Sequence, residues 1–483
     1  MHTERSHSAA LRVEAGVPAV AAWVHGPMAE LNRDIIARRR PAGEFPAAVA
    51  TALSTLAVVP ERCTPQEARR LVVLLGLVGA GLGRHHQEQD PAHRQRPERA
   101  FDLTAGPDRV PFLDYFARLA ARTGHPQRDA YASLTRWNLP VSEAWWGDTR
   151  LATLPGEFDD GLIRTYTGER DEVRFLELIK LSETLERAVN GTLAPLAEET
   201  VDVCGAEAVH RLGVAAELLD AIRRLNTAFA ALPPADGLRV GHFLDVFRQF
   251  AVHWRPGDVP PSGALDPEAL ERDLLLGVDP PGYRRHIARL RPGLLDGEWD
   301  RLGVVMDRPG LPELLLARLR PAGDLAEQSP AGLRVLLGSC PALGALYLVL
   351  RAHARVSSAH LMLAKKYLFT PQRDRDRAGV GDTGVVSNRR GTTGMDEAAL
   401  ERLTRIRGRH PLTALRRLPT ADLESLAGVD VLRSHGRAEA RFAFSAAALV
   451  RPRTSDDDTR DDDTRGGDPP DGGATGDRPA GQP

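Results

Sequence analysis

The segment Pro341–Phe369 reads PALGALYLVLRAHARVSSAHLMLAKKYLF and is the longest helical pattern in the chain. Its apolar residues recur at intervals of three and four positions, and Pro341 is of the type favoured at the first position of a helix. Leu346, His353 and His360 fall near one stripe of such a helix. The spacing predicts a long helix that carries two histidines on an apolar face.

The same spacing recurs along most of the chain, whereas persistent period-two alternation bounded by turn residues is lacking. The ranges with helical spacing are 47–59, 65–82, 110–122, 127–137, 171–196, 207–232, 240–254, 266–278, 281–290, 311–319 and 396–407. We therefore expect an all-α fold with few strands.

Three parts are expected along the chain: a smaller N-terminal helical part over 1–125, a large helical body over 126–450, and an acidic tail over 451–483. The tail contains two DDDTR units and has no apolar period. Such a composition cannot bury enough surface to offset the entropy of ordering it, so the tail is expected to be disordered.

The charge of the 483-residue chain is nearly balanced, with 63 Lys and Arg against 65 Asp and Glu and a net charge of −2. This balance gives no strong field toward nucleic acid or an anionic membrane. No stretch approaches the roughly 18 uninterrupted apolar residues of a membrane span, and we see no signal peptide. The three cysteines are far apart and suit neither a disulfide framework nor a CxxC metal site. We expect a cytoplasmic protein that binds neither nucleic acid nor membranes.

His360 has small neighbours, Ser357 three residues before it and Ala364 four residues after it. A haem held by an axial histidine needs this room. A lone histidine on an apolar helix face is also a common hydrogen-bonded core residue. His353, two turns earlier on the same stripe, is the rival ligand.

A second candidate segment, His242–Trp254, reads HFLDVFRQFAVHW in a chain with only 5% aromatic residues. We expect one helix there, with Phe243, Phe247 and Phe250 on one face. Arg248 lies inside this run and is either a clamp for a substrate carboxylate or a residue that points to solvent. On a continuous helix it lies about 140° from Phe243.

Three other patterns are weaker. The loop before the helix start Asp266–Pro267 contains small residues that let backbone approach a ligand, namely Ser262, Gly263 and Ala264. The segment Thr370–Gly394 has no apolar period and is either a lid or a surface insertion. His85–His93 is expected to be a polar loop. No P-loop, GxSxG or HExxH motif is present, and GAGLG at 79–83 lies in a helical pattern.

Four of these segments resemble, in order and approximate spacing, the haem site of the indoleamine and tryptophan 2,3-dioxygenase superfamily. SSAHLMLAKKYLF resembles its proximal-histidine helix, and RGTTGMDEAALERLTRIR resembles its closing loop and last helix. GHFLDVFRQFAVHW is similar to its distal helix, and PSGAL is similar to its loop over the haem. LTRWNLP (134–140) and YTGERDEVRFLELIKLSETLERAV (166–189) are most similar to the branch that rearranges 7-chlorotryptophan in the pyrrolnitrin pathway. The resemblance covers roughly 125–410.

The resemblance implies a large helical haem-binding bundle of the indoleamine dioxygenase type. It implies an oxygenase of secondary metabolism that uses O₂ at haem b and acts on tryptophan or a modified aromatic amino acid. His360 would be the ligand of the haem iron. The implied substrate-binding residues are Arg248, Phe243, Ser262, Gly263, Ala264, Gly391, Thr392, Thr393 and Gly394. No general acid or base is implied, so no catalytic residue is expected.

The sequence departs from the family in several respects, and the distal serine of the dioxygenases is not located in it. It has Gly-Thr-Thr-Gly at 391–394 where the dioxygenases have Gly-Thr-Gly-Gly-Thr, and His253 where they have Gly. The reaction therefore stays open between ring-cleaving dioxygenation and a mono-oxygenating or rearranging reaction. The alternatives from other classes are a haem-binding sensor without turnover and a helical interaction protein without haem. The oligomeric state is not indicated.

Overall fold

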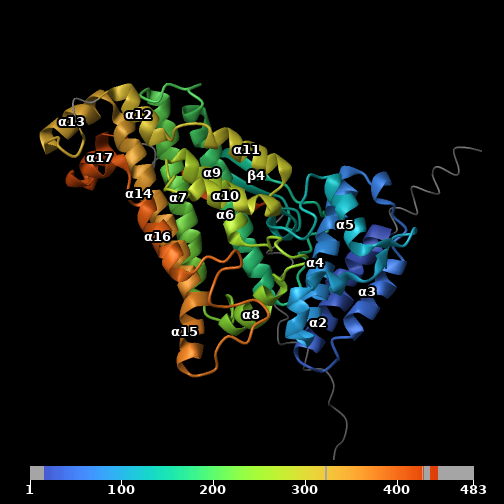
Figure 1. Cartoon of the computed structure of the whole chain (residues 1–483). Coiled ribbons are helices and arrows are strands. Elements are labelled where there is room, and N and C mark those ends of the chain that lie inside the picture. Colours follow the sequence, from blue (N-terminus) through green and yellow to red (C-terminus); the bar gives the residue numbers. More distant parts are fainter. Residues whose placement is uncertain (1–15, 321–323, 427, 429–435, 444–483) are drawn as a thin grey trace, which may run out of the picture. The chain divides into compact units, whose positions relative to one another are not determined.

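The segment that begins at Pro341 forms one long helix, as its apolar spacing predicts. Helix α14 spans Pro341–Ala364. A π-helical turn, η9 (Lys365–Phe369), joins it to α15 (Thr370–Arg377). Figure 1 shows α14 beside α7 (Ala206–Ala231), with which it makes its largest contact.

The chain is largely helical in the computed structural model, which describes residues 16–320, 324–426, 428 and 436–443. Further α-helices are α2 (Ala29–Ile36), α3 (Glu44–Ser54), α4 (Pro65–Gln89), α5 (Phe112–Ala121), α6 (Arg170–Ala197), α8 (Val240–Asp245), α9 (Pro267–Leu275), α10 (Tyr283–Leu290), α11 (Asp296–Met306), α12 (Leu311–Leu319), α13 (Pro330–Ser339), α16 (Glu397–Arg407) and α17 (Thr420–Leu426). Short 3-10 and π segments are η1 (Val24–Met28), η2 (Pro60–Arg62), η3 (Pro91–Gln95), η4 (Pro97–Phe101), η5 (Ala132–Arg136), η6 (Phe247–Phe250), η7 (Gly263–Leu265), η8 (Arg291–Gly293) and η10 (Pro411–Arg417). Most of the expected helices are confirmed, but in 127–137 the helical segment is only the π turn η5.

Two small antiparallel sheets accompany the helices. β1 (Thr104–Ala105) pairs with β2 (Val110–Pro111). β3 (Ser142–Trp146) pairs with β4 (Thr149–Leu154) on one side and with β5 (Ala438–Phe442) on the other. The second sheet therefore ties the last described segment to the residues just before α6.

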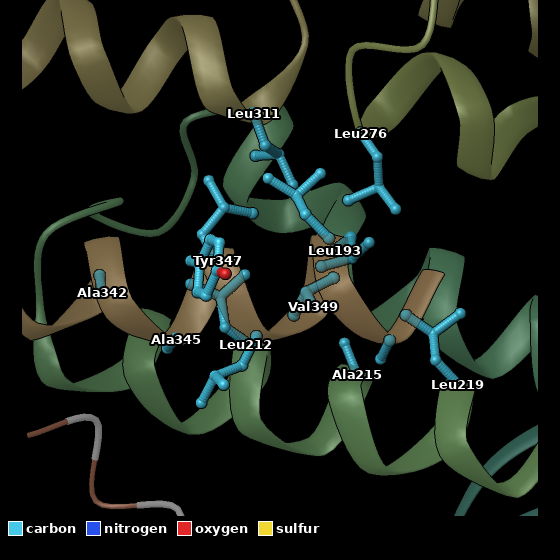
Figure 2. Packing of buried hydrophobic residues seen from close by; sticks show 14 of the residues in the cluster. Leu193, Leu212, Ala215, Leu219, Leu276, Leu311, Ala342, Ala345, Tyr347 and Val349 are labelled. Atoms are coloured by element: carbon cyan, nitrogen blue, oxygen red, sulfur yellow. The ribbon is translucent and has the colours of Figure 1, made fainter. Parts of the chain in front are cut away.

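The larger hydrophobic core lies along the first half of α14. Figure 2 shows Tyr347 of this helix packed among residues that include Leu212 of α7 and Leu193 of α6. Every residue from Ala342 to Leu350 is buried, because this half of α14 is apolar on all sides. The core thus fixes the position of the helix that continues to His360.

A second core joins the N-terminal helices, and glycines of α4 let aromatic rings approach there. A Cβ atom on Gly79 would lie 2.2 Å from Cζ2 of Trp254, and one on Gly81 would lie 2.4 Å from Cζ of Phe45. Trp254 and Phe250 belong to this core. The GAGLG run therefore serves close packing, and the N-terminal helices share their core with residues from the middle of the chain.

The continuous helix expected over 240–254 is wrong. Helix α8 ends at Asp245, and after Val246 (φ −119°, ψ −74°) the chain forms only the 3-10 turn η6. Nε2 of Gln249 donates to the carbonyl of Leu244 at 2.7 Å, which occupies an acceptor at the end of the helix. A side chain thus takes the place of the next helical turn.

This break changes how the aromatic residues expected on one face lie. Phe243 and Phe247 remain neighbours, with ring centroids 6.3 Å apart. Phe247 and Phe250 both contact Tyr166 in the N-terminal core, with ring centroids at 5.7 and 4.2 Å. Arg248 lies in η6, so the separation of about 140° from Phe243 on one helix does not apply.

Two segments expected to be loops are partly helical. The first eight residues of Thr370–Gly394 form α15, whose Arg375 makes two hydrogen bonds to the carboxylate of Asp245, at 2.6 and 2.7 Å. The segment His85–His93 begins inside α4, where His85 is buried and its Nε2 lies 2.7 Å from Oδ1 of Asn32. These partners are distant in sequence, so local apolar spacing does not reveal them.

Among the described residues, no single helix combines the length and the apolar composition that a membrane crossing needs. α13 and the helix that follows it have this length and composition only when they are taken together, and the chain bends by 108° between them. The described residues belong to one compact unit. The expected tail, 451–483, lies outside them, and the boundaries near residues 125 and 450 stay predictions.

Candidate functional site

His360 lies on the inner face of α14 but is open to solvent. His353 and Ser357, seven and three residues earlier on this face, are 0% and 2% exposed. Tyr367, seven residues after His360, is buried again at 5% exposed. His360 between them is exposed. The opening is therefore confined to a short stretch of an otherwise buried helix face.

The protein around His360 nevertheless disfavours its charged form. Desolvation lowers the pKa of His360 to about 4, the positive charge of Arg407 acts in the same direction, and Glu186 opposes it. The imidazole is neutral at pH 7, and within the described residues neither of its nitrogens has a hydrogen-bond partner.

His353, the rival ligand, belongs to a buried polar network. Its Nε2 lies 3.0 Å from Oδ1 of Asp273, and both residues are 0% exposed. The carboxylate of Asp273 also accepts two hydrogen bonds from Arg407 and one from the hydroxyl of Tyr283. His353 is therefore a core histidine in contact with a buried carboxylate, and it has no surface open to a ligand from outside the chain.

Phe243 lies close to the end of α14 and to the loop that follows α15. Its ring centroid is 6.4 Å from that of Tyr367. The same apolar cluster contains Ala364, four residues after His360, and Met395, which follows the GTTG segment. The structure thus brings together three of the four segments predicted to form the site.

Arg248 is buried and holds the loop that leads to Gly391. Its Nη2 donates to the backbone carbonyls of Ser387 and Arg390 at 2.7 and 2.8 Å. Burial lowers the pKa of Arg248 to about 10, with Asp382 opposing, so the guanidinium stays charged at pH 7. Its Nε is buried without a partner, and the described residues offer no acceptor to Nη1. The solvent-facing alternative is wrong, and donors remain for an anion.

Gln249, which was not predicted from the sequence, anchors the same loop. Its side-chain amide both accepts from and donates to the backbone of Val386, as a peptide group of a neighbouring strand would. Its Oε1 accepts from the amide of Val386 at 2.8 Å, and its Nε2 donates to the carbonyl of Val386 at 3.2 Å. Nε2 also lies 3.3 Å from Oδ1 of Asn388. Gln249 is only 3% exposed, so these bonds are shielded from water. The loop is thus held by two consecutive residues of η6.

Gly391–Gly394 forms a closed turn. The amide of Gly394 donates to the carbonyl of Gly391 at 2.8 Å, and the amide of Gly391 donates to the carbonyl of Met395 at 2.7 Å. Gly394 has φ +85°, a conformation that favours glycine. Thr392 and Thr393 are half-buried at the tip of this turn.

Ser262, Gly263 and Ala264 precede α9, which starts as predicted. Oδ1 of Asp266 accepts from the amides of Glu268 and Ala269, at 2.9 and 3.2 Å. Oγ of Ser262 accepts only from its own turn, and the described contacts join none of the three small residues to the other predicted substrate residues. Their place at the site remains a prediction.

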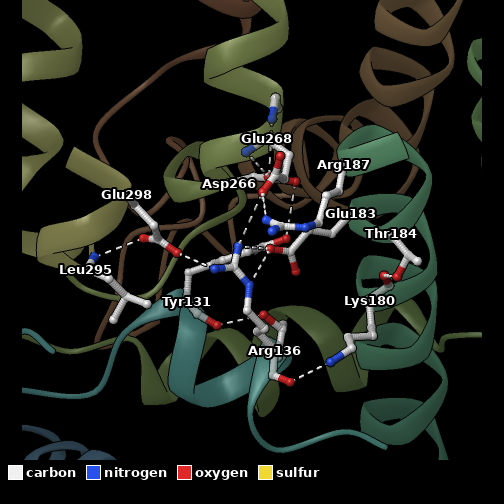
Figure 3. Close-up of polar contacts among 12 residues, drawn as sticks. Tyr131, Arg136, Lys180, Glu183, Thr184, Arg187, Asp266, Glu268, Leu295 and Glu298 are labelled. Carbon is white, nitrogen blue, oxygen red and sulfur yellow. Dashed lines mark hydrogen bonds and ion pairs between the residues drawn. The ribbon is translucent and has the colours of Figure 1, made fainter. Parts of the chain in front are cut away.

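Asp266 belongs to a buried cluster of carboxylates and arginines. Figure 3 shows Arg136 at the centre of this cluster, with Nε 3.0 Å from Oε1 of Glu183. Asp266 contacts the carboxyl group of Glu186, and burial beside Glu186 and Glu183 raises the pKa of Asp266 well above its usual range. A buried carboxyl group beside other carboxylates binds its proton more tightly, because adjacent negative charges repel each other. Glu186 links the cluster to His360, on which its charge also acts.

The residues around His360 fit an axial haem ligand. The imidazole is neutral, as a metal ligand must be, and it is open on a face with small neighbours, Ser357 and Ala364. In the part of the chain that the structure describes, no group of three or more His, Cys, Asp or Glu is arranged to hold a metal ion. A metal at His360 therefore needs its remaining ligands from a cofactor.

Sequence reasoning also missed the buried charged residues that support the site, Asp273, Arg407 and Glu186. Asp273 follows two other charged residues in ERDLLLGV, so the sequence gives no local signal that it is buried. Its partners could not be named, because Arg407 and His353 come from distant segments.

No protein-family model matches the chain, and a search of curated proteins finds no matching sequence.

Proposed function

We propose that the chain is a haem-dependent oxygenase that acts with O₂ on tryptophan or a modified aromatic amino acid, and that His360 is the axial ligand of its haem b. The observation that carries the proposal is the exposure of His360 on a helix face that is buried on both sides of it. The sequence resemblance supports the same residue. A bound haem supplies the oxygen chemistry, while the chain supplies binding, orientation and exclusion of water.

Each predicted residue has a role in this proposal. His360 holds the iron through a nitrogen that carries no proton to be displaced at pH 7. Phe243 offers an aromatic face near the end of the same helix, and Arg248 has donors left for a substrate carboxylate. The turn Gly391–Gly394 closes the site, and Ser262–Ala264 lines it.

Titration of the apo-protein with haemin, followed by its Soret absorption, tests the ligand. We expect one haem per wild-type chain and loss of stoichiometric binding in His360→Ala. His360→Gly should regain binding when imidazole is added, because the free base occupies the place of the missing side chain. The matched control is His210→Ala, which removes an exposed histidine from α7 and should bind haem like the wild type. Unchanged stoichiometry in His360→Ala contradicts the proposal.

Reaction of the reduced, haem-loaded protein with O₂ distinguishes the reaction types. Tryptophan, 7-chlorotryptophan and tyrosine are the substrates to compare, with products identified by mass spectrometry. Gain of two oxygen atoms indicates dioxygenation, and gain of one indicates mono-oxygenation. A product of altered skeleton indicates rearrangement. Haem binding without turnover of any aromatic amino acid would favour the sensor alternative.

A further inference from the structure

Arg407, the last residue of α16, reaches the helix that carries His360. Asp273 of α9 holds its guanidinium with two hydrogen bonds, at 2.9 Å from Nε and 2.6 Å from Nη2. The third nitrogen, Nη1, donates to Oγ of Ser357 at 3.2 Å. Ser357 lies one turn before His360 on the same face. Three helices therefore meet at one guanidinium directly beside the candidate ligand.

The charge of Arg407 is fixed in place. Its side chain is only 12% exposed, and the Asp273 carboxylate that holds it is 0% exposed. Asp273 contacts α14 at His353, whereas Arg407 contacts it at Ser357, one turn closer to His360. Because the positive charge lies nearer to His360 than the negative one, Asp273 compensates only part of it there.

The surroundings of His360 contain charges of both signs, and Arg407 contributes most. Arg272 adds a second positive charge, and Glu186 adds a negative one. Glu186 and Arg272 also pair with each other, with 2.8 Å between Oε1 and Nη1. The described residues place no carboxylate in hydrogen-bonding contact with the His360 ring. Among the charged groups that act on this imidazole, a cation therefore has the largest effect.

We infer that Arg407 is a positioning residue for His360, a role that rests on the proposed haem function. It anchors α14 one turn before the ligand and places a fixed positive charge behind it. A carboxylate partner would increase electron donation by the imidazole, whereas a nearby cation decreases it. Because ferrous haem carries one positive charge less than ferric haem, the cation also favours the ferrous form. The arrangement thus suits a site that uses O₂ in the reduced state.

The reduction potential of the haem-loaded protein tests this role. Arg407→Met should lower the potential, so that the ratio of ferrous to ferric haem at a fixed solution potential falls roughly tenfold, as expected for a unit charge acting over about 10 Å at an effective dielectric constant near 20. Arg407→Lys should retain most of the wild-type potential, because it keeps the charge. Arg405→Met is the matched control on the same helix, since Arg405 is exposed and screened by solvent.

Arg407→Gln keeps an amide donor for Asp273 without the charge, so it replaces Arg407→Met if that variant does not fold. The same lower potential is expected. If the neutral variant binds haem at His360 with an unchanged potential, the role of Arg407 is wrong while the proposed function stands. If Arg407→Lys lowers the potential as much as the neutral variants, the charge is not the cause and the role is again wrong. A wild-type chain that binds no haem refutes the proposed function and this role together.

Discussion

Trp254 lies so close to Gly79 that α4 has no room for a side chain at this position. The ring atom Cζ2 is 2.2 Å from the place of a Cβ, and Cη2 is 2.3 Å from it. Trp254 is 0% exposed, and its ring also contacts those of Phe101 and Phe116. Neither the indole nor the helix can move aside without disturbing the N-terminal core.

Gly79→Ala should therefore destabilise the protein, although alanine is the better helix former. We expect the free energy of unfolding to fall by about 1–3 kcal/mol, the usual effect of overpacking a core. Gly191→Ala is the control, because Gly191 is an exposed residue of α6 whose Cβ would meet nothing. That variant should be stabilised by up to about 1 kcal/mol. Denaturant titration measures both, and stabilisation of both variants would contradict the packing argument.

The contact between Asp266 and Glu186 should make stability depend on pH. The pKa of Asp266 is raised in the folded state, so the folded protein binds this proton more tightly than the unfolded chain. Its contribution to stability is full below the ordinary pKa of about 3.9 and is lost as the pH rises through the raised pKa. Asp266→Asn should flatten this dependence, since its amide can donate to Glu186 without titrating.

The control for this prediction is Asp396→Asn. Asp396 caps α16 as Asp266 caps α9, with Oδ1 accepting from the amide of Ala399 at 2.8 Å, but it is exposed. Asparagine is also a good cap, so this variant tests the loss of the cap carboxylate alone. Denaturant titrations between pH 5 and 8.5 give the free energy of unfolding at each pH. This free energy should change less with pH in Asp266→Asn than in the wild type, and Asp396→Asn should behave like the wild type. An equal dependence in wild type and Asp266→Asn would show that Asp266 does not hold the proton.

The two histidines of α14 should differ sharply in their effect on the stability of the apo-protein. His353→Ala removes a buried ring and a contact of the Asp273 carboxylate, so it should lower the free energy of unfolding by about 2–4 kcal/mol. His360→Ala removes an exposed ring without a partner and should stay within about 0.5 kcal/mol of wild type. Thermal and denaturant unfolding without haem measure both. A large loss in His360→Ala would show that His360 packs in the core.

Arg248→Ala should release the loop before Gly391 even without a ligand. Two carbonyl contacts of that loop depend on the guanidinium, and Arg389 and Arg390 are exposed sites for trypsin. Cleavage there should become several-fold faster. Arg289→Ala, which removes an exposed arginine of α10, should leave the cleavage rate unchanged. Equal rates in all three proteins would mean that Arg248 does not hold the loop.

A pair of ligands separates this loop contact from a contact with substrate. Arg248→Ala should weaken binding of tryptophan to the haem-loaded protein roughly 10- to 100-fold, the value of a hydrogen bond between charged groups. Tryptamine lacks the carboxylate and should bind nearly as before. Equal weakening of both ligands would show that Arg248 acts only through the loop, and no weakening of either would remove it from the site.

The helices were largely predictable from the sequence, because a buried face repeats its apolar residues at helical spacing. The start of α9 was predictable for another local reason, since Asp266 and Pro267 are a cap and a first residue. α15 was missed because nothing in TPQRDRDR is apolar, and its Arg375 instead pairs with Asp245 from another segment. Local pattern therefore predicts elements that carry their own apolar face and fails where distant partners stabilise them.

The site was predictable only in part for the same reason. His353 and His360 occupy equivalent positions on one stripe of α14, and spacing alone does not separate them. Asp273 contacts His353, whereas His360 stays exposed to solvent. This difference arises from the packing between helices. For Arg248 the sequence left a carboxylate clamp and a solvent-facing side chain open. The structure buries the guanidinium, and its backbone partners follow from the path of the loop.

The π-helical turn Lys365–Phe369 has a consequence for how this chain tolerates changes in length. Its wider turn lets three consecutive side chains, Tyr367, Leu368 and Phe369, all be buried, which one face of an α-helix does not permit. A π turn holds one residue more than the α-helical turn that it replaces, so deletion of one residue there would restore regular winding and leave α15 in nearly the same orientation. Arg375 would then keep its alignment with Asp245, and His360 would keep its place. A change in length by one residue is thus absorbed within this turn.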